Sequence, residues 1–151
     1  GPGVRSQNCR GGVTPEAVAI GATVVRELAF EWEQSAEDLA ELKEWRFYYS
    51  ETQGGPYQPW IDSEGVHISV PYDATQEPPF SSQPRSVNLN LPPGKSKVFY
   101  FVATAVDNDD HEGGYSAEAL NPDGSTGVVF KAFLGIPINM KVTVNISHPS
   151  N

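Results

Sequence analysis

Large apolar side chains alternate with polar ones in several short segments, and this period of two is the feature that most limits how the chain can fold. Leu28, Phe30 and Trp32 recur at every second position, while Glu31 and Glu33 fall between and after them. Successive side chains of a β-strand point to opposite faces, so this pattern predicts a strand with one buried face. Trp32 is therefore expected to point into the core.

The same alternation recurs along the rest of the chain. Trp45, Phe47 and Tyr49 share one side of a predicted strand, with Trp45 in the core, and Tyr48 projects to the other side. There Tyr48 either forms an exposed patch with Tyr100 or lies half-covered on the sheet surface. Further strands are predicted at residues 66–70, 86–91, 98–106, 128–133 and 140–146.

These short strands, separated by clusters of Gly, Pro, Asn and Asp, predict an all-β fold. An antiparallel β-sandwich is favoured over a ligand-holding barrel, which periodicity alone does not exclude. Helix is expected mainly as a single turn after Ser35, from which Leu39 and Leu42 touch the core. Residues 121–124 form a turn signal, and the proline-rich stretch 71–85 is expected to be an irregular surface loop.

Charge and cysteine content exclude several kinds of site. The chain carries 10 Lys and Arg against 19 Asp and Glu, a net charge of −9, so its surface repels nucleic acid and anionic membranes. No apolar run approaches the roughly 18 residues that a membrane-spanning helix needs, so no membrane insertion is expected. Cys9 is the single cysteine of the sequence, which excludes an intrachain disulfide and a cysteine-based zinc site.

The order of these segments resembles a fibronectin type III domain over residues 28–120. The matching motifs are, in chain order, residues 28–32 (second strand, with its inward Trp), 42–49 (third strand), 91–94 and 99–107 (corner and sixth strand) and 114–118 (entry to the last strand). The resemblance implies an immunoglobulin-like β-sandwich with extra terminal segments. It also implies a module that works without a cofactor, by presenting loops and sheet edges.

One sandwich over residues 23–134 is expected to form the folded domain. The chain begins with Gly-Pro, a pattern typical of the scar left by tag removal, and residues 1–22 are interpreted as this scar and a leader segment. Residues 135–151 are expected to form either a terminal strand that docks on the domain or the start of a linker or further module.

Oxygen-bearing side chains are concentrated in a predicted inter-strand loop at residues 107–114. Asp107, Asp109, Asp110 and Glu112 make this loop a candidate binding site. Calcium takes roughly six to eight oxygen ligands, and Asp107, Asp109 and Glu112 with loop carbonyls supply several of them, which defines a weak calcium candidate. The spacing departs from an EF-hand loop, and a solvated turn without metal is the alternative interpretation.

Tyr57, Trp60 and Tyr72 are binding candidates of a second kind. They lie in turn-rich segments outside the clear core strands, and flat aromatic rings stack on the apolar faces of sugars. For Trp60 the alternative is packing in the core or at a sheet edge, because Trp60 and Ile61 are placed to begin a strand.

No motif of conventional catalysis occurs in the sequence. A nucleophile elbow, a Gly-rich phosphate loop and a His-Glu-x-x-His motif are absent, and His67 is expected to face solvent on a strand. The sequence therefore predicts a non-enzymatic spacer or protein-interaction module of an extracellular, cell-surface or virion-associated protein. The alternative is a carbohydrate-binding accessory module of a secreted glycoside hydrolase, with a polysaccharide as partner. The oligomeric state is left open.

Overall fold

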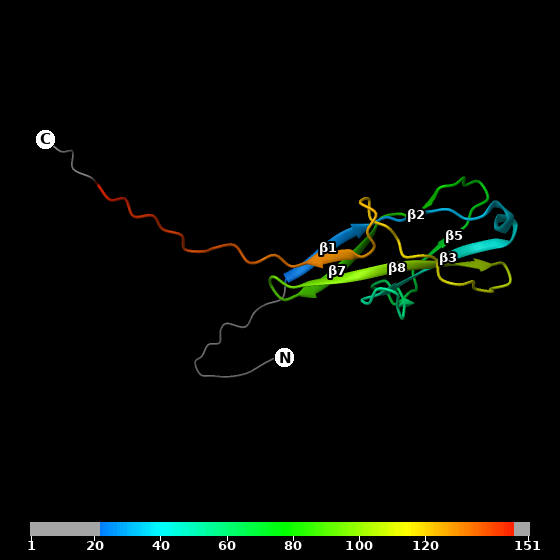
Figure 1. Cartoon of the computed structure of the whole chain (residues 1–151), viewed down its shortest axis with the longest axis horizontal. Coiled ribbons are helices and arrows are strands. Elements are labelled where there is room, and N and C mark those ends of the chain that lie inside the picture. Colours follow the sequence, from blue (N-terminus) through cyan, green and yellow to red (C-terminus); the bar gives the residue numbers. More distant parts are fainter. Residues whose placement is uncertain (1–21, 147–151) are drawn as a thin grey trace.

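Two long antiparallel strands, β3 (Leu42–Ser50) and β8 (Ser96–Asp107), form the centre of the structure, a computed structural model that describes residues 22–146 (Figure 1). Both strands are rich in aromatic and β-branched residues, which pack well on a pleated surface. Their register pairs Trp45 with Ala105 and Ser50 with Tyr100. The odd-numbered side chains from Trp45 to Tyr49 therefore face one way and the even-numbered ones the other.

The remaining strands form open, antiparallel sheets, some together with this central pair and some apart from it. They are β1 (Ala22–Leu28), β2 (Glu31–Trp32), β4 (Gln58–Pro59), β5 (Ser69–Pro71), β6 (Phe80–Ser81), β7 (Arg85–Leu91) and β9 (Val128–Lys131). Within residues 22–146, β4, β5, β3, β8 and β9 form a five-stranded sheet, β1 pairs with β7, and β2 pairs with β6. The prediction of an all-β fold is confirmed. No helix of this part of the chain is long and apolar enough to cross a membrane.

The strand predicted around residues 28–33 is interrupted. β1 ends at Leu28, and β2 contains only Glu31 and Trp32. At the break, the backbone N–H of Phe30 donates to Ser82 Oγ, and the Ser82 N–H donates to the Phe30 carbonyl, both at 2.9 Å. These two bonds carry the chain from pairing with β7 to pairing with β6.

The interpretation of residues 71–85 as an irregular loop is wrong at residues 80–81, which form β6 opposite β2. Phe80 is only 2% exposed, and its ring centroid lies 4.9 Å from that of Trp45. A strand of two residues has no periodicity, so the sequence pattern does not reveal it. The single apolar side chain nevertheless anchors this segment in the core.

Two local predictions concern turns. After Ser35 the chain forms a 3₁₀-helix, η2 (Ala36–Glu41), whose six residues are longer than the single turn expected; Leu39 packs against the core as predicted, and Leu42 reaches it as the first residue of β3. The turn at residues 121–124 closes with a hydrogen bond from the Gly124 N–H to the Asn121 carbonyl at 2.8 Å.

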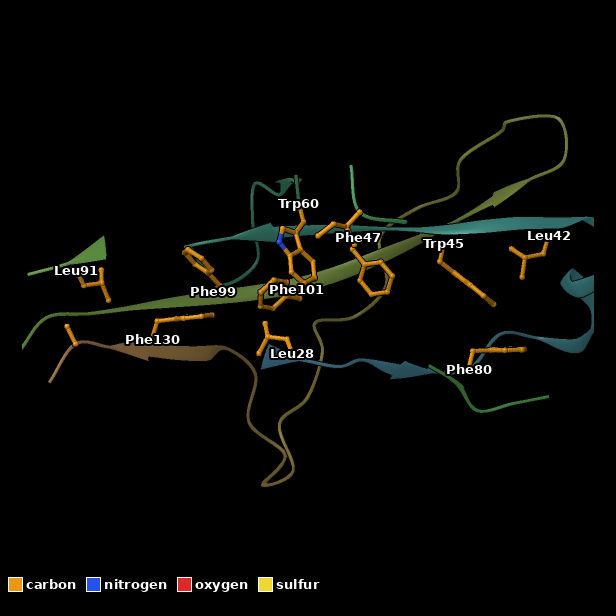
Figure 2. Close-up of a cluster of buried hydrophobic side chains, with 12 residues drawn as sticks. Leu28, Leu42, Trp45, Phe47, Trp60, Phe80, Leu91, Phe99, Phe101 and Phe130 are labelled. Carbon is orange, nitrogen blue, oxygen red and sulfur yellow. The ribbon is translucent and has the colours of Figure 1, made fainter. Parts of the chain in front are cut away.

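One cluster of buried apolar side chains connects strands that do not pair with each other. Leu28 of β1 and Phe80 of β6 lie across this cluster from Phe47 and Trp45 of β3 (Figure 2). Phe30 sits between them, with ring centroids 5.3 Å from Phe47 and 5.2 Å from Phe101 of β8. The rings that the alternation placed on the buried side all lie in or against this one cluster: Trp45 and Phe47 are among its buried members, and Phe30, Trp32 and Tyr49 are partly buried and pack against it.

The predicted strand at residues 140–146 has no strand partner within the described residues. After β9, Ala132 is still buried and donates its N–H to the Lys95 carbonyl at 2.9 Å. The chain then runs away from the body as an extended, exposed segment, orange to red in Figure 1. The interpretation of residues 1–22 as scar and leader, which includes Cys9, falls outside the described residues except for residue 22, where β1 begins.

Truncation of a core ring should be far more costly than truncation of an exposed ring close to it in the chain. Phe130 of β9 is 0% exposed and Phe133 is 80% exposed. We expect Phe130→Ala to lower the free energy of unfolding by about 3–5 kcal/mol and Phe133→Ala to change it by about 0.5 kcal/mol or less. Urea denaturation followed by tryptophan fluorescence measures both, and equal losses would show that the buried cluster is wrongly placed.

Candidate binding surface

The outer face of the five-stranded sheet carries a cluster of tyrosine rings. Tyr48 of β3 points to this face because Phe47 and Tyr49 on either side of it point into the core. Its ring centroid lies 5.1 Å from that of Tyr115 and 4.8 Å from that of His67. Tyr115 in turn lies 5.1 Å from Tyr57. We call Tyr48, Tyr57, His67 and Tyr115 the tyrosine face.

Glu112 fixes the buried end of this face. An isolated β-bridge between Val106 and Glu112 holds its backbone beside β8. Its Oε2 accepts hydrogen bonds from Thr104 Oγ1 at 2.6 Å and from the Tyr48 hydroxyl, and its Oε1 lies 3.5 Å from Arg46 Nη1. One carboxylate thus orders side chains from both central strands.

These contacts set the ionisation states of Glu112 and Tyr48. Burial raises the pKa of Glu112, but the hydroxyls of Thr104 and Tyr48 and the charge of Arg46 lower it by more, so it lies below its usual 4.5. Burial and the hydrogen bond to Glu112 raise the pKa of Tyr48 to about 12. At neutral pH, Glu112 is therefore an anion and Tyr48 a neutral donor to it.

A second carboxylate holds the other end of the tyrosine face. Glu118 Oε2 accepts hydrogen bonds from the Tyr57 hydroxyl at 2.6 Å and from the Gly54 N–H at 2.8 Å. The bond to Glu118 raises the pKa of Tyr57 to about 12. Tyr115 lies between the two anchored rings and is 51% exposed, so it presents its ring to solvent on a pre-ordered base.

An acidic hollow lies beside this face, at the end of the sheet where η2 meets the 107–113 loop. It has a volume of about 450 Å³. Its carboxylate-bearing lining residues are Glu37, Asp38, Glu41, Asp107 and Glu112. The loop is held against η2 by a hydrogen bond from the Asn108 N–H to the Glu41 carbonyl at 2.9 Å. This arrangement gives one end of the molecule a concentrated negative potential.

All four predicted acidic site residues lie in this loop, and the side chains of three of them, Asp107, Asp110 and Glu112, make different contacts. Asp107 Oδ1 accepts the N–H groups of Asp109 and His111 at 2.9 and 2.8 Å, and the bond to His111 is the main cause that lowers its pKa. Asp110 pairs with Lys43 of β3, and Glu112 points onto the tyrosine face. Within residues 22–146 no group of three or more His, Cys, Asp or Glu side chains is arranged to hold a metal ion.

The three predicted aromatic site residues do not form one surface. Trp60 is buried in the core against Phe101, with ring centroids 5.1 Å apart. Tyr72 is half-buried and packs edge-on against Trp45. Only Tyr57 belongs to the tyrosine face. The alternative interpretation of Trp60, packing in the core, is the one that the structure supports.

Sequence reasoning missed Tyr115 and Glu118 and left His67 as a solvent-facing residue. For Tyr48 the sequence did contain a signal, because the alternation at residues 45–49 placed its side chain on the outer face. The remaining members come from segments that reach the face through turns, so their meeting depends on strand pairings that no local pattern reveals.

Comparison with models of protein families, with curated protein sequences and with solved structures gives no match for this chain.

Tyr48 and Tyr57 should ionise near pH 12 instead of near 10. A folded-state pKa above the unfolded value stabilises the fold below pH 10, and this contribution is lost as the pH rises through 12. Ultraviolet titration of the wild type should show late components that Tyr48→Phe and Tyr57→Phe each remove in part. A tyrosinate signal that is complete well below pH 12 would contradict the anchoring by Glu112 and Glu118.

The loop at residues 107–114 should be stable without calcium. Three of its carboxylates are already engaged: Asp107 by backbone N–H groups, Asp110 by Lys43 and Glu112 by the tyrosine face. We expect the same melting temperature in EDTA and in millimolar Ca²⁺, measured by scanning calorimetry. A clear rise with Ca²⁺, absent in Asp109→Asn, would instead show that the loop binds the ion.

Proposed function

We propose that this chain is a non-catalytic, fibronectin type III-like module that serves as a protein-interaction domain in an extracellular, cell-surface or virion-associated protein. The support for a sandwich is the single buried cluster between strands that do not pair. Trp45 of β3 contacts Phe80 of β6, and Phe30 contacts Phe101 of β8. Contacts of this kind are expected where two sheets pack face to face.

The tyrosine face is the observation that carries the proposed interaction. Tyrosine and arginine are enriched at the energetic centres of protein interfaces, because they supply large contact area and a polar group at low entropic cost. Tyr48 and Tyr57 are held by Glu112 and Glu118 before any partner arrives. A partner that covers Tyr115 would therefore have little ordering entropy to overcome.

The acidic hollow favours a partner with a basic rim. It adjoins the tyrosine face through Glu112, which takes part in both. A cationic partner would be steered toward this end, with an association rate that falls as salt rises. A phosphate-rich partner would be repelled, in agreement with the net charge of −9.

Capture of extracellular or surface proteins on the immobilised chain tests this proposal. We expect a partner retained by the wild type and by Asn88→Ala, an exposed control position on β7, and lost or weakened about tenfold or more by Tyr115→Ala. Because Tyr115 is half exposed, its removal should leave the melting temperature nearly unchanged. Partners retained equally by Tyr115→Ala would show that another surface binds.

The same face supports a carbohydrate-binding module as the second candidate function. The exposed ring of Tyr115 beside Tyr57 is a stacking surface, and the carboxylate of Glu118 is close enough to hydrogen-bond Tyr57. Binding to insoluble polysaccharides, lost in Tyr115→Ala and kept in Tyr72→Phe, would support this function. Failure to bind any polysaccharide would leave the protein-interaction function alone.

A further inference from the structure

The segment that follows β9 has the alternation of a β-strand, but it pairs with no other strand of residues 22–146. Apolar residues occupy every second position: Ile136, Ile138, Met140, Val142, Val144 and Ile146. Their side chains are each 76–85% exposed. The alternation assigns these side chains to one face, and in the structure a bend at Asn139, whose φ is +55°, interrupts the extended backbone. This exposed apolar surface is far larger than monomeric proteins normally leave uncovered. We call residues 136–146 the tail strand.

The body of the molecule has a strand edge without a ladder beside a groove. β1 pairs with β7 on one side, and within residues 22–146 its other edge forms no strand ladder, although Arg26 Nη1 donates to the Val129 carbonyl of β9 at 2.5 Å. Two adjoining hollows of about 210 and 430 Å³ run between the 26–32 stretch and the 116–122 segment, and they share Phe30, Glu31 and Ala119. We call them together the β1–β2 groove.

The floor of this groove is part of the aromatic core. Phe30, Trp32 and Phe101 line it, so the core reaches the surface here. The Trp32 ring is part of this lining, whereas its Nε1, the one buried side-chain nitrogen or oxygen of the described residues without a hydrogen-bond partner, lies beneath the surface. The groove thus offers an apolar bed to an extended chain.

We propose that the tail strand of one copy binds as an added β-strand in the β1–β2 groove of a second copy. Its apolar side chains would cover the aromatic floor, and its backbone would pair with the edge of β1 beside the groove. At roughly 3.3 Å per residue the groove beside residues 26–32 is on the order of 20 Å long, which the tail strand exceeds. This self-association goes beyond the proposed function and does not depend on the tyrosine face.

Charge favours this occupant. Lys141 is the only charged residue of the tail strand, and it lies on the polar face of the alternation. Exposed Glu27 and Glu31 stand along the groove. Arg26 also lines the groove and donates from Nη1 to the Val129 carbonyl at 2.5 Å, so with Glu27 and Glu31 the groove keeps a net negative charge, which the single cation of the tail strand complements.

Sedimentation velocity of the full chain over a range of concentrations tests the proposal. We expect a species larger than the monomer that Val142→Asp weakens by about tenfold or more, because it places a charge on the buried face. Thr143→Asp, the neighbour on the opposite face, is the matched control and should associate like the wild type. A wild type that stays monomeric at its highest soluble concentration overturns the proposal, as does equal loss in both variants.

Blocking the groove should have the same effect as damaging the tail strand. Ala117 and Leu120 are exposed lining residues, so Ala117→Arg and Leu120→Asp should fold normally and fail to associate. A mixture of Val142→Asp, with an intact groove, and Ala117→Arg, with an intact tail strand, should regain association. A mixture that remains monomeric would show that the tail strand does not enter this groove.

The Trp32 indole N–H reports which groove is filled. In ¹⁵N-labelled Val142→Asp, its resonance should shift when unlabelled Ala117→Arg is added and should not shift with unlabelled Val142→Asp. An indole signal that is protected in every variant, independent of concentration, would show that the groove is filled within each chain and would overturn the proposal.

Discussion

The packing of aromatic rings between β3 and β8 on one side and β1, β2 and β6 on the other holds this protein together. Phe30 touches Phe47, Trp60 and Phe101 at once, with centroid separations of 5.2–5.7 Å. Each such ring pair contributes about 0.5–1.5 kcal/mol of stability beyond what the burial of its apolar area contributes. The short strands β2 and β6 form few backbone bonds, so they keep their places through Trp32 and Phe80 in this cluster.

The tyrosine face is a consequence of the same packing. Once Phe47 and Tyr49 enter the core, the pleat forces Tyr48 outward. There it meets Thr104 and Glu112 from the far end of β8 and the turn beyond it. The Glu112 carboxylate and the hydroxyls of Tyr48 and Thr104 satisfy one another's hydrogen bonds where they are partly buried. The tyrosine face therefore depends on the core that it covers.

Sequence reasoning succeeded where a local pattern carries the information and failed where pairing decides. The alternation at residues 45–49 was enough to divide core from outer face. It was silent about Phe80, whose two-residue strand has no period. For Trp60 it left open a surface platform and packing in the core, and the burial of the ring supports the second. It grouped Asp107, Asp109 and Glu112 as one candidate ligand set by proximity in sequence; in the structure Asp107 accepts backbone N–H groups of its own loop, and Glu112 accepts the hydroxyls of Thr104 and Tyr48.

The sequence by itself determined the class of structure, because a period of two in apolar residues can be buried only by strands that present one face to a common core. The same period of two predicted a strand at residues 140–146, which pairs with no other strand of the described residues. Tertiary structure decided the rest. Tyr48 and Glu112 are separated by 64 positions, and the tail strand and Trp32 by more than a hundred. Which of them meet, and which edge stays open, depends on the order and register of strand pairing, and no local propensity encodes that order.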